Sequence, residues 1–252
     1  MSVPATRRTP AVAAERGQPW VLERRHVGWV EQVGIIVGKD VIIELRTGEV
    51  VTTSAFFACV VVIMSSLCFY VDEGNRAQVA AGAIWLSTAF AAVLSLSRTW
   101  QRERQDRAFD ALVVSPLSQS AIFLGKAIGL LAFLLVIEAV VVPTAAVLLT
   151  IDLIEHGSGL LVIGLLATPG IAAAGALFGV MTVSTRARDL VLAIVLFPLL
   201  SPTLLAAVAS TRNLFDGVPL GELTGFLQVM LVFDVAFLAG GLALFPPLAD
   251  GG

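Results

Sequence analysis

Six stretches of the chain are long enough and apolar enough to cross a lipid bilayer. They cover residues 50–71, 77–97, 127–151, 159–183, 190–211 and 223–245. A helix rises about 1.5 Å per residue, so a hydrocarbon core of about 30 Å requires roughly 20 such residues. Segments in which apolar and polar residues alternate, as in a membrane β-barrel, do not occur. The sequence therefore predicts an all-α integral membrane protein with six transmembrane helices.

The composition supports a membrane protein and argues against several other classes. Of the 252 residues, 57% are hydrophobic and 14% are charged, whereas soluble domains are about 45–50% apolar and about 25% charged. A soluble fold would expose large apolar patches with such an excess. The formal net charge of −3 argues against a nucleic-acid-binding domain, and the two cysteines argue against a disulfide scaffold.

The basic residues predict the orientation of the helices. If both termini are cytoplasmic, only Arg76 and Arg212 of the 16 Lys and Arg residues lie outside, which leaves 14 in cytoplasmic segments. The reverse orientation would place 2 inside and 14 outside. Because basic residues are retained on the cytoplasmic side, we expect both termini in the cytoplasm.

The six-helix domain, residues 50–245, has shorter segments on either side. Residues 1–28 are polar and proline-containing, and they predict a mobile tail without the apolar region of a cleavable signal. Residues 246–252 form a short C-terminal tail. Residues 29–49 predict an amphipathic helix that lies in the cytoplasmic interface of the membrane. Its expected apolar face consists of Val33, Ile36, Val37, Val41 and Leu45, and its polar positions are Glu31, Lys39, Asp40, Glu44 and Arg46.

The chain lacks the motifs of an enzyme. Gly38-Lys39 and Gly125-Lys126 have neither the preceding glycine nor the following Ser or Thr of a phosphate-binding loop. No HExxH or GxSxG motif occurs, and the two histidines offer little from which to build a metal site. We therefore expect no catalytic residues and no metal site, and the sequence identifies no cofactor-binding residue.

Residues 98–126, which connect the second and third spans, are the most informative cytoplasmic segment. The first half predicts a helix with oppositely charged residues four apart, and Ser115-Pro116 ends it. Its charged and apolar residues are Arg102, Glu103, Asp106, Arg107, Phe109, Asp110, Leu112 and Val113. Such a helix is suited to docking onto another protein, but an ordinary solvated loop is an equally good interpretation.

Two carboxylic acids lie about midway along predicted spans, Glu138 in 127–151 and Asp234 in 223–245. A charge at the bilayer centre costs at least about 2.5–3.5 kcal/mol, so such residues usually face a bundle interior, a partner or water. One interpretation is a translocation or partner-contact site between helices. The other is a neutral, hydrogen-bonded acid that holds helices together.

The fourth span contains a series of small residues. Gly164, Gly170, Gly175 and Gly179 recur at intervals of four to six. Glycine lets neighbouring helices approach closely, so this span is predicted to offer a packing face.

Four sequence stretches, in this order, carry a resemblance to a known family. They are KDVIIELRTGE (39–49), DRAFDALVVSPLSQSAIFLGK (106–126), STRARDLVLAIVLFPLLSP (184–202) and QVMLVFDVAFL (228–238). With six spans of this length and order, residues 33–245 resemble the cytochrome c maturation protein B family, also called haem exporter protein B. The chain departs from that family at Arg107, where many relatives have glycine, and in its longer N-terminal tail.

The resemblance implies an ABC-2-type permease fold in a bacterial cytoplasmic (inner) membrane. It implies a homodimer that pairs with two copies of an ATPase subunit, which binds ATP and magnesium. Other implied partners are a tryptophan-rich haem-handling membrane protein and a periplasmic haem chaperone, so haem is expected in the complex. Residues 102–113 would be the coupling helix that docks on the ATPase, and Glu138 and Asp234 match acidic positions of the family.

Two other functions are compatible with these sequence features. The chain could be an ABC-2-type permease that exports a lipid, polysaccharide or drug. Alternatively, it could be an assembly scaffold that organises a haem-handling complex without any ATP-coupled motion.

Overall fold

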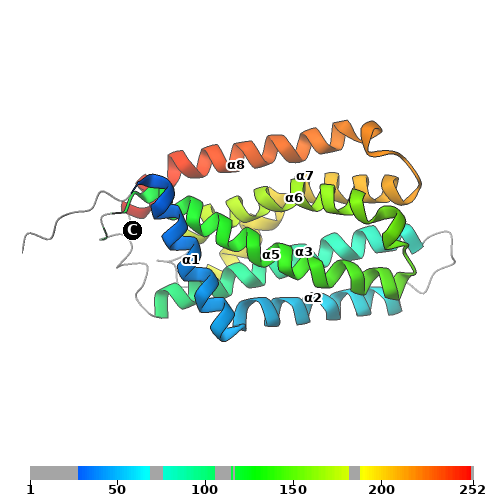
Figure 1. Cartoon of the computed structure of the whole chain (residues 1–252), viewed down its shortest axis with the longest axis horizontal. Coiled ribbons are helices and arrows are strands. Elements are labelled where there is room, and N and C mark those ends of the chain that lie inside the picture. The colour runs from blue at the N-terminus through cyan, green and yellow to red at the C-terminus, as the bar shows by residue number, and fades with distance from the viewer. Residues whose placement is uncertain (1–27, 69–75, 106–114, 116, 182–187, 251–252) are drawn as a thin grey trace, which may run out of the picture.

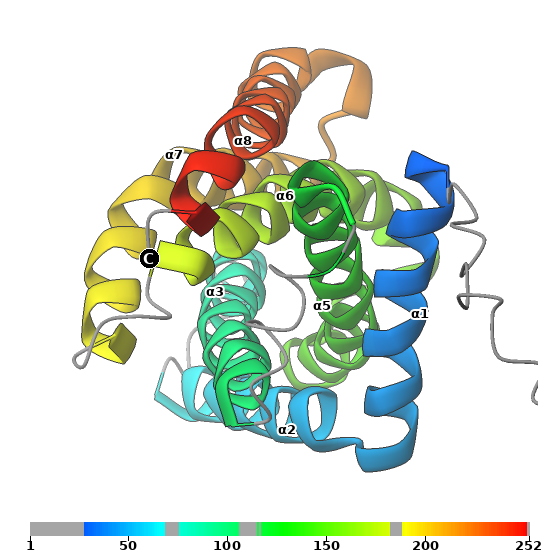
Figure 2. The same cartoon turned by 90° about the vertical axis from the view of Figure 1, so that its left-hand side faces the viewer.

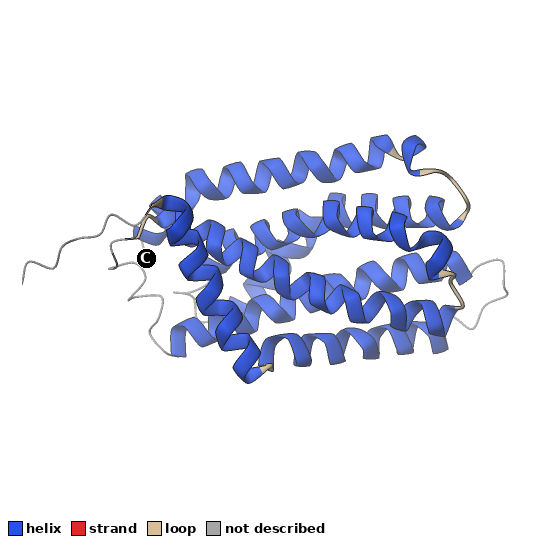
Figure 3. Cartoon of the chain, in the orientation of Figure 1, coloured by secondary structure: helices blue, strands red, loops and turns tan. Residues whose placement is uncertain are grey.

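The computed structural model describes residues 28–68, 76–105, 115, 117–181 and 188–250, and all regular structure within them is helical (Figure 3). The elements are α1 (Trp29–Thr47), α2 (Glu49–Cys68), α3 (Arg76–Gln105), α5 (Gln119–Leu149), α6 (Leu153–Met181), α7 (Arg188–Phe215), the short η2 (Leu220–Glu222) and α8 (Thr224–Asp250). Six of them, α2, α3 and α5 to α8, are long and apolar enough to cross a membrane. The prediction of an all-α chain with six candidate spans is confirmed.

The six long helices run side by side along the long axis of the molecule (Figure 1). Viewed end-on, α3 lies inside the bundle and packs against α2, α5, α6 and α7 (Figure 2). Helix α8 lies on the outside against α5, α6 and α7. Helix α1 crosses one end of the bundle obliquely and packs mainly on α5.

Glycines on α6 explain why α3, α5 and α6 pack so closely. Gly175 faces Leu96 of α3 and Leu130 of α5, and a Cβ atom at this position would lie 3.0 Å from both side chains. Gly179 is covered by the indole of Trp100, which leaves no room for a Cβ atom. The predicted packing face on the fourth span is therefore confirmed.

Two helices extend further into the 98–126 connection than the apolar pattern predicts. Helix α3 continues to Gln105, past the apolar stretch that ends at residue 97, and α5 begins at Gln119, before the apolar stretch that starts at residue 127. The prediction treated charged residues as the ends of spans. In the structure, however, Glu103 and Lys126 are buried together inside the helical bundle, so they do not end their helices.

Candidate functional site

Helix α1 contacts the first turns of α5 through a glycine. Gly125 lies directly beneath Ile36, and a Cβ atom on this glycine would come within 2.7 Å of that side chain. The close approach places Asp40, one turn further along α1, beside Lys126. The Gly125-Lys126 pair thus joins two helices by contact and by charge.

Four charged side chains from three helices form what we call the buried charge cluster: Lys39 and Asp40 of α1, Glu103 of α3 and Lys126 of α5. The Lys126 Nζ lies 3.0 and 2.8 Å from the two carboxylate oxygens of Asp40, and 2.5 Å from Glu103 Oε1. The Lys39 Nζ donates to the same Glu103 oxygen at 2.6 Å and lies 3.2 Å from Asp40 Oδ1. The cluster ties the ends of α3 and α5 to α1.

The charges of the cluster balance, which offsets part of the cost of burying them. Asp40, Glu103 and Lys126 are 7%, 5% and 4% exposed, and two cations face two carboxylates. Burial lowers the pKa of Lys39, but Asp40 and Glu103 raise it more, so the net pKa lies above the usual 10.5. Removing one member would leave a buried charge uncompensated, which is strongly destabilising.

A second, more exposed set of ion pairs extends from the cluster toward the start of α2. Arg102 of α3 lies 3.5 Å from Glu44 Oε2 and 3.1 Å from Glu49 Oε2. Glu44 also accepts a hydrogen bond of 2.7 Å from the backbone N–H of Val51 in the first turn of α2. The cytoplasmic end of α3, in the predicted orientation, is therefore linked to both sides of the α1–α2 junction.

The buried face of α1 includes two of the predicted polar positions. Asp40 and Glu44 are buried, whereas Leu45 of the predicted apolar face is 81% exposed, and the interfacial position of this helix stays a prediction. The four buried residues of this helix are Val33, Ile36, Asp40 and Glu44. Their helical spacing was a usable signal, because it places both acids on the stripe that begins with Val33 and Ile36.

The predicted coupling residues fall into two groups. Arg102 and Glu103 belong to the last turn of α3, and their side chains contact α1 and α5 within the chain. The others lie outside the described residues: Asp106, Arg107, Phe109, Asp110, Leu112 and Val113. Their docking role therefore remains a prediction, although the described ends of α3 and α5 show what the segment is attached to.

Glu138 of α5 is turned toward α6. The hydroxyl of Thr168 lies 2.7 Å from Glu138 Oε1 and also 2.7 Å from the carbonyl oxygen of Gly164. The other carboxyl oxygen, Oε2, is close to Gly164, where a Cβ atom would approach it to 3.2 Å. The acid is 9% exposed and packs against the Gly164–Thr168 turn of α6.

Asp234 of α8 meets the same helix from another side. It is 7% exposed, and its Oδ1 is a buried atom without a hydrogen-bond partner among the described residues. This oxygen lies over Gly170, where a Cβ atom would approach it to 2.5 Å. Glu138 and Asp234 thus contact α6 on either side of Pro169, which lies inside the helix.

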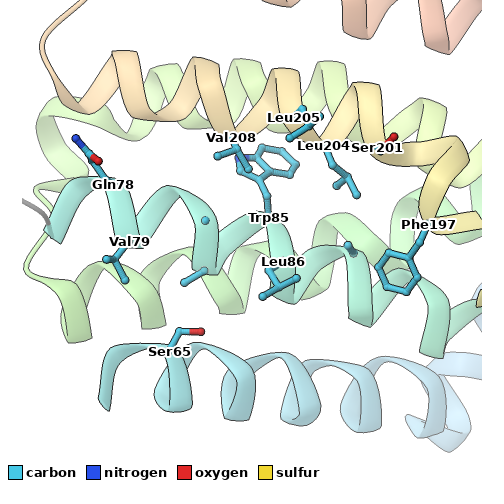
Figure 4. Close-up of a pocket in the computed structure, with 13 residues that line it drawn as sticks. Ser65, Gln78, Val79, Trp85, Leu86, Phe197, Ser201, Leu204, Leu205 and Val208 are labelled. Atoms are coloured by element: carbon cyan, nitrogen blue, oxygen red, sulfur yellow. The ribbon is translucent and has the colours of Figure 1, made fainter. Parts of the chain in front are cut away.

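An apolar groove opens between α3 and α7, with Ser65 of α2 at its edge (Figure 4). Its volume is about 550 Å³, within the usual range for a small-molecule site. Trp85 and Phe197 provide aromatic surface, and the Trp85 indole N–H donates to Thr211 at 2.8 Å. The described lining contains none of the His, Cys, Met or Tyr side chains that bind haem iron in proteins.

Comparison with known proteins finds similar chains in several bacteria. The chain is 25% identical to heme exporter protein B of Bradyrhizobium diazoefficiens over 218 residues, which are 86% of this chain and 96% of that protein. It is 27% identical to heme exporter protein B of Rhodobacter capsulatus, over 75% of this chain and 88% of that protein. The protein of the same name from Haemophilus influenzae is 26% identical, over 78% and 89% of the two chains.

The family model described as CcmB protein matches residues 32–245. This match begins within α1 and ends within α8, so it includes five candidate spans in full, most of the sixth, and the buried charge cluster. The chain therefore belongs to the CcmB protein family.

Proposed function

We propose that this chain is the permease subunit of an ABC complex for c-type cytochrome biogenesis. In this proposal the chain is a homodimer with an ABC-2-type fold and pairs with two copies of a separate ATPase, which binds ATP and magnesium. The motion driven by ATP hydrolysis serves haem delivery or the release of a haem-loaded periplasmic chaperone, together with a tryptophan-rich haem-handling membrane protein. Family membership and the relatives' names support this assignment.

The buried charge cluster is the observation that carries the coupling mechanism. Glu103 lies two residues before the end of α3, and Lys126 lies in the second turn of α5, so the intervening segment is attached to one cluster at both ends. An ATPase that pushes on this segment would move α3, α5 and α1 together, because separating the buried charges is costly. In this proposal the side chains of the buried charge cluster are sufficient to transmit the movement from the segment to the three helices.

The basic residues support an orientation in which the buried charge cluster is at the cytoplasmic end of the bundle. The 106–114 segment joins the helix ends that carry the cluster, and this is the end that the basic residues place in the cytoplasm. An ATPase in the cytoplasm of a bacterium would reach this end of a permease in the inner membrane. In our proposal both termini are also on the cytoplasmic side of the membrane.

We do not assign haem ligation to the α3–α7 groove. Its described lining is apolar and lacks an iron ligand. In our proposal, haem is handled by the partner membrane protein, and this chain supplies the ATP-driven conformational change.

Substitution of Leu112 tests the docking part of this proposal. Leu112 lies outside the described residues, on the predicted apolar patch of the 102–113 segment. Leu112→Asp places a charge on this patch and is expected to abolish co-purification of the ATPase while membrane insertion survives. Leu112→Met, which keeps the patch apolar, should retain the ATPase. Unchanged co-purification with Leu112→Asp would exclude this docking surface.

A further inference from the structure

A second groove runs along the outer surface between α5 and α6, on the half of the membrane away from the buried charge cluster. Its volume is about 470 Å³, and it is lined by residues from Leu135 to Pro143 of α5 and from Leu153 to Leu165 of α6. On α6 this stretch spans roughly 18 Å at about 1.5 Å per residue. Leucines make up much of its wall, and Ala139, Gly157 and Gly164 are small residues between them.

Glu138 is the acidic residue in the groove lining, and one of its oxygens is available to an occupant. A hydroxyl has one proton, so Thr168 donates either to Glu138 Oε1 or to the Gly164 carbonyl. In the second case the carboxyl group donates its own proton to Thr168. Oε2 is an acceptor in this second case, and also in the first case when the carboxyl group is ionised, and no donor reaches it from the described residues.

The chemistry of the groove favours a helix over an acyl chain. Ala139, Leu161 and Leu165 line an apolar surface, which a helix or a lipid tail can cover equally well. A lipid tail, however, leaves a carboxyl oxygen near the bilayer centre without a hydrogen bond, and unsatisfied polar groups are costly there. A transmembrane helix can cover the same surface and also donate a hydrogen bond. Glycine and alanine in the wall permit the close approach that such helix pairs use.

We propose that the α5–α6 groove is the docking site for a transmembrane helix of another membrane protein, which presents a hydrogen-bond donor to Glu138 Oε2. A hydroxyl, amide, indole or cationic side chain at the depth of Glu138 has the required chemistry. The site is on a different part of the chain from the ATPase-docking segment, and it does not depend on the coupling proposal.

Photocrosslinking in intact membranes tests whether a helix occupies the groove. The photoreactive amino acid p-benzoylphenylalanine replaces Leu161 in the groove or, as a control, Val232 on α8; both native side chains are 64% exposed. After irradiation of cells that contain the chain with its natural neighbours, crosslinked peptides are identified by mass spectrometry. The expected product at Leu161 is a transmembrane peptide of a different membrane protein with a donor side chain, and it is absent at Val232.

Two pairs of variants test the contact itself. Gly157→Leu places a bulky side chain in the groove at a position where a Cβ atom meets nothing within 4 Å, and the control Gly240→Leu on α8 starts from an equally open position. The crosslink should be lost in the first and kept in the second. Glu138→Gln keeps an acceptor and should retain the crosslink. Glu138→Leu should weaken it by about three- to twentyfold, the effect of one hydrogen bond in a membrane.

Three results would overturn the proposal. These are crosslinking of Leu161 to lipid alone, crosslinking to a second copy of this chain, and a product unaffected by Gly157→Leu. Because the crosslink at Leu161 is measured in a chain with Glu138 intact, the test stands even if Glu138→Leu fails to fold. Retention of the crosslink in Leu112→Asp, which is expected to lose the ATPase, would separate this site from the coupling function.

Discussion

Lys126 illustrates how a charged residue can be buried in a helical bundle when acids from neighbouring helices pair with it. It is almost completely buried at the end of an apolar helix, where an unpaired ammonium group would be very unfavourable. Two carboxylates from two other helices compensate its charge. Lys126 therefore holds the three helices together at the position where, in our proposal, the ATPase-docking segment is attached.

The buried and exposed ion pairs should differ sharply in their contribution to stability. Lys126→Met removes the central cation and should lower the free energy of unfolding by about 3–5 kcal/mol, because it leaves Asp40 and Glu103 undercompensated. Arg98→Met breaks an exposed pair with Glu49, which is 3.3 Å long, and should cost less than about 1 kcal/mol. Thermal unfolding of the purified protein in detergent measures both. An equal loss of unfolding free energy in the two variants would show that the buried charge cluster does not hold the helices together.

Asp234 is predicted to be important for function, not for insertion. Its buried Oδ1 has no side-chain partner among the described residues, and the acid lies against Gly170 of α6 near the middle of its span. Asp234→Leu should leave the chain in the membrane but reduce the mature c-type cytochromes detected by haem staining, and Asp234→Asn should be milder. The neighbouring Val235, 59% exposed, offers Val235→Leu as a control. Normal cytochrome levels in Asp234→Leu would show that the acid is dispensable.

At the scale of single elements, α1 and α6 show two ways in which small residues position the helices. Helix α6 uses glycines to admit the side chains of α3 and α5. Helix α1 packs closely on α5 because Gly125 of α5 leaves room for the side chain of Ile36. In both cases the absence of one Cβ atom sets the distance between two helices.

Alanine substitutions at two glycines test the contact between α1 and α5. Gly125→Ala would press a Cβ atom against Ile36, and overpacking of this kind costs about 1–3 kcal/mol. It should also push Asp40 away from Lys126. Gly38→Ala in α1 meets nothing within 4 Å and should be neutral or stabilise the helix by up to about 1 kcal/mol. Thermal unfolding distinguishes them, and a Gly125→Ala variant as stable as Gly38→Ala would contradict the close packing described here.

The sequence predicted those elements whose structure depends on a local property of the segment, and it did not predict contacts between distant segments. The six spans could be predicted, because length and hydrophobicity decide whether a helix fits a bilayer. The glycine face of α6 could be predicted because glycine has no side chain, so recurring glycines on one helix allow a neighbouring helix to come close. The charge cluster could not, because Asp40, Glu103 and Lys126 are far apart in sequence and each is ordinary in its own segment. Their pairing depends on how α1 crosses α5, which no local pattern specifies.

At the scale of the whole molecule, the chain combines an apolar six-helix bundle with the buried charge cluster at one end. In our proposal the ATPase pushes on the helices that the cluster joins. Deeper in the bundle, the side chains of Glu138 and Asp234 contact α6. Helix α6 contacts α3, α5, α7 and α8. A movement of the helices at the buried charge cluster would therefore shift α6 and the two acids that contact it.

The most direct test of this account is to purify the tagged chain gently from its native membrane and identify every co-purifying protein by mass spectrometry. The account predicts an ATPase subunit together with a tryptophan-rich haem-handling membrane protein. An ATPase without the haem-handling protein would favour a permease for another substrate. A folded preparation that contains no ATPase would contradict the central claim that this chain couples ATP hydrolysis to cytochrome c biogenesis.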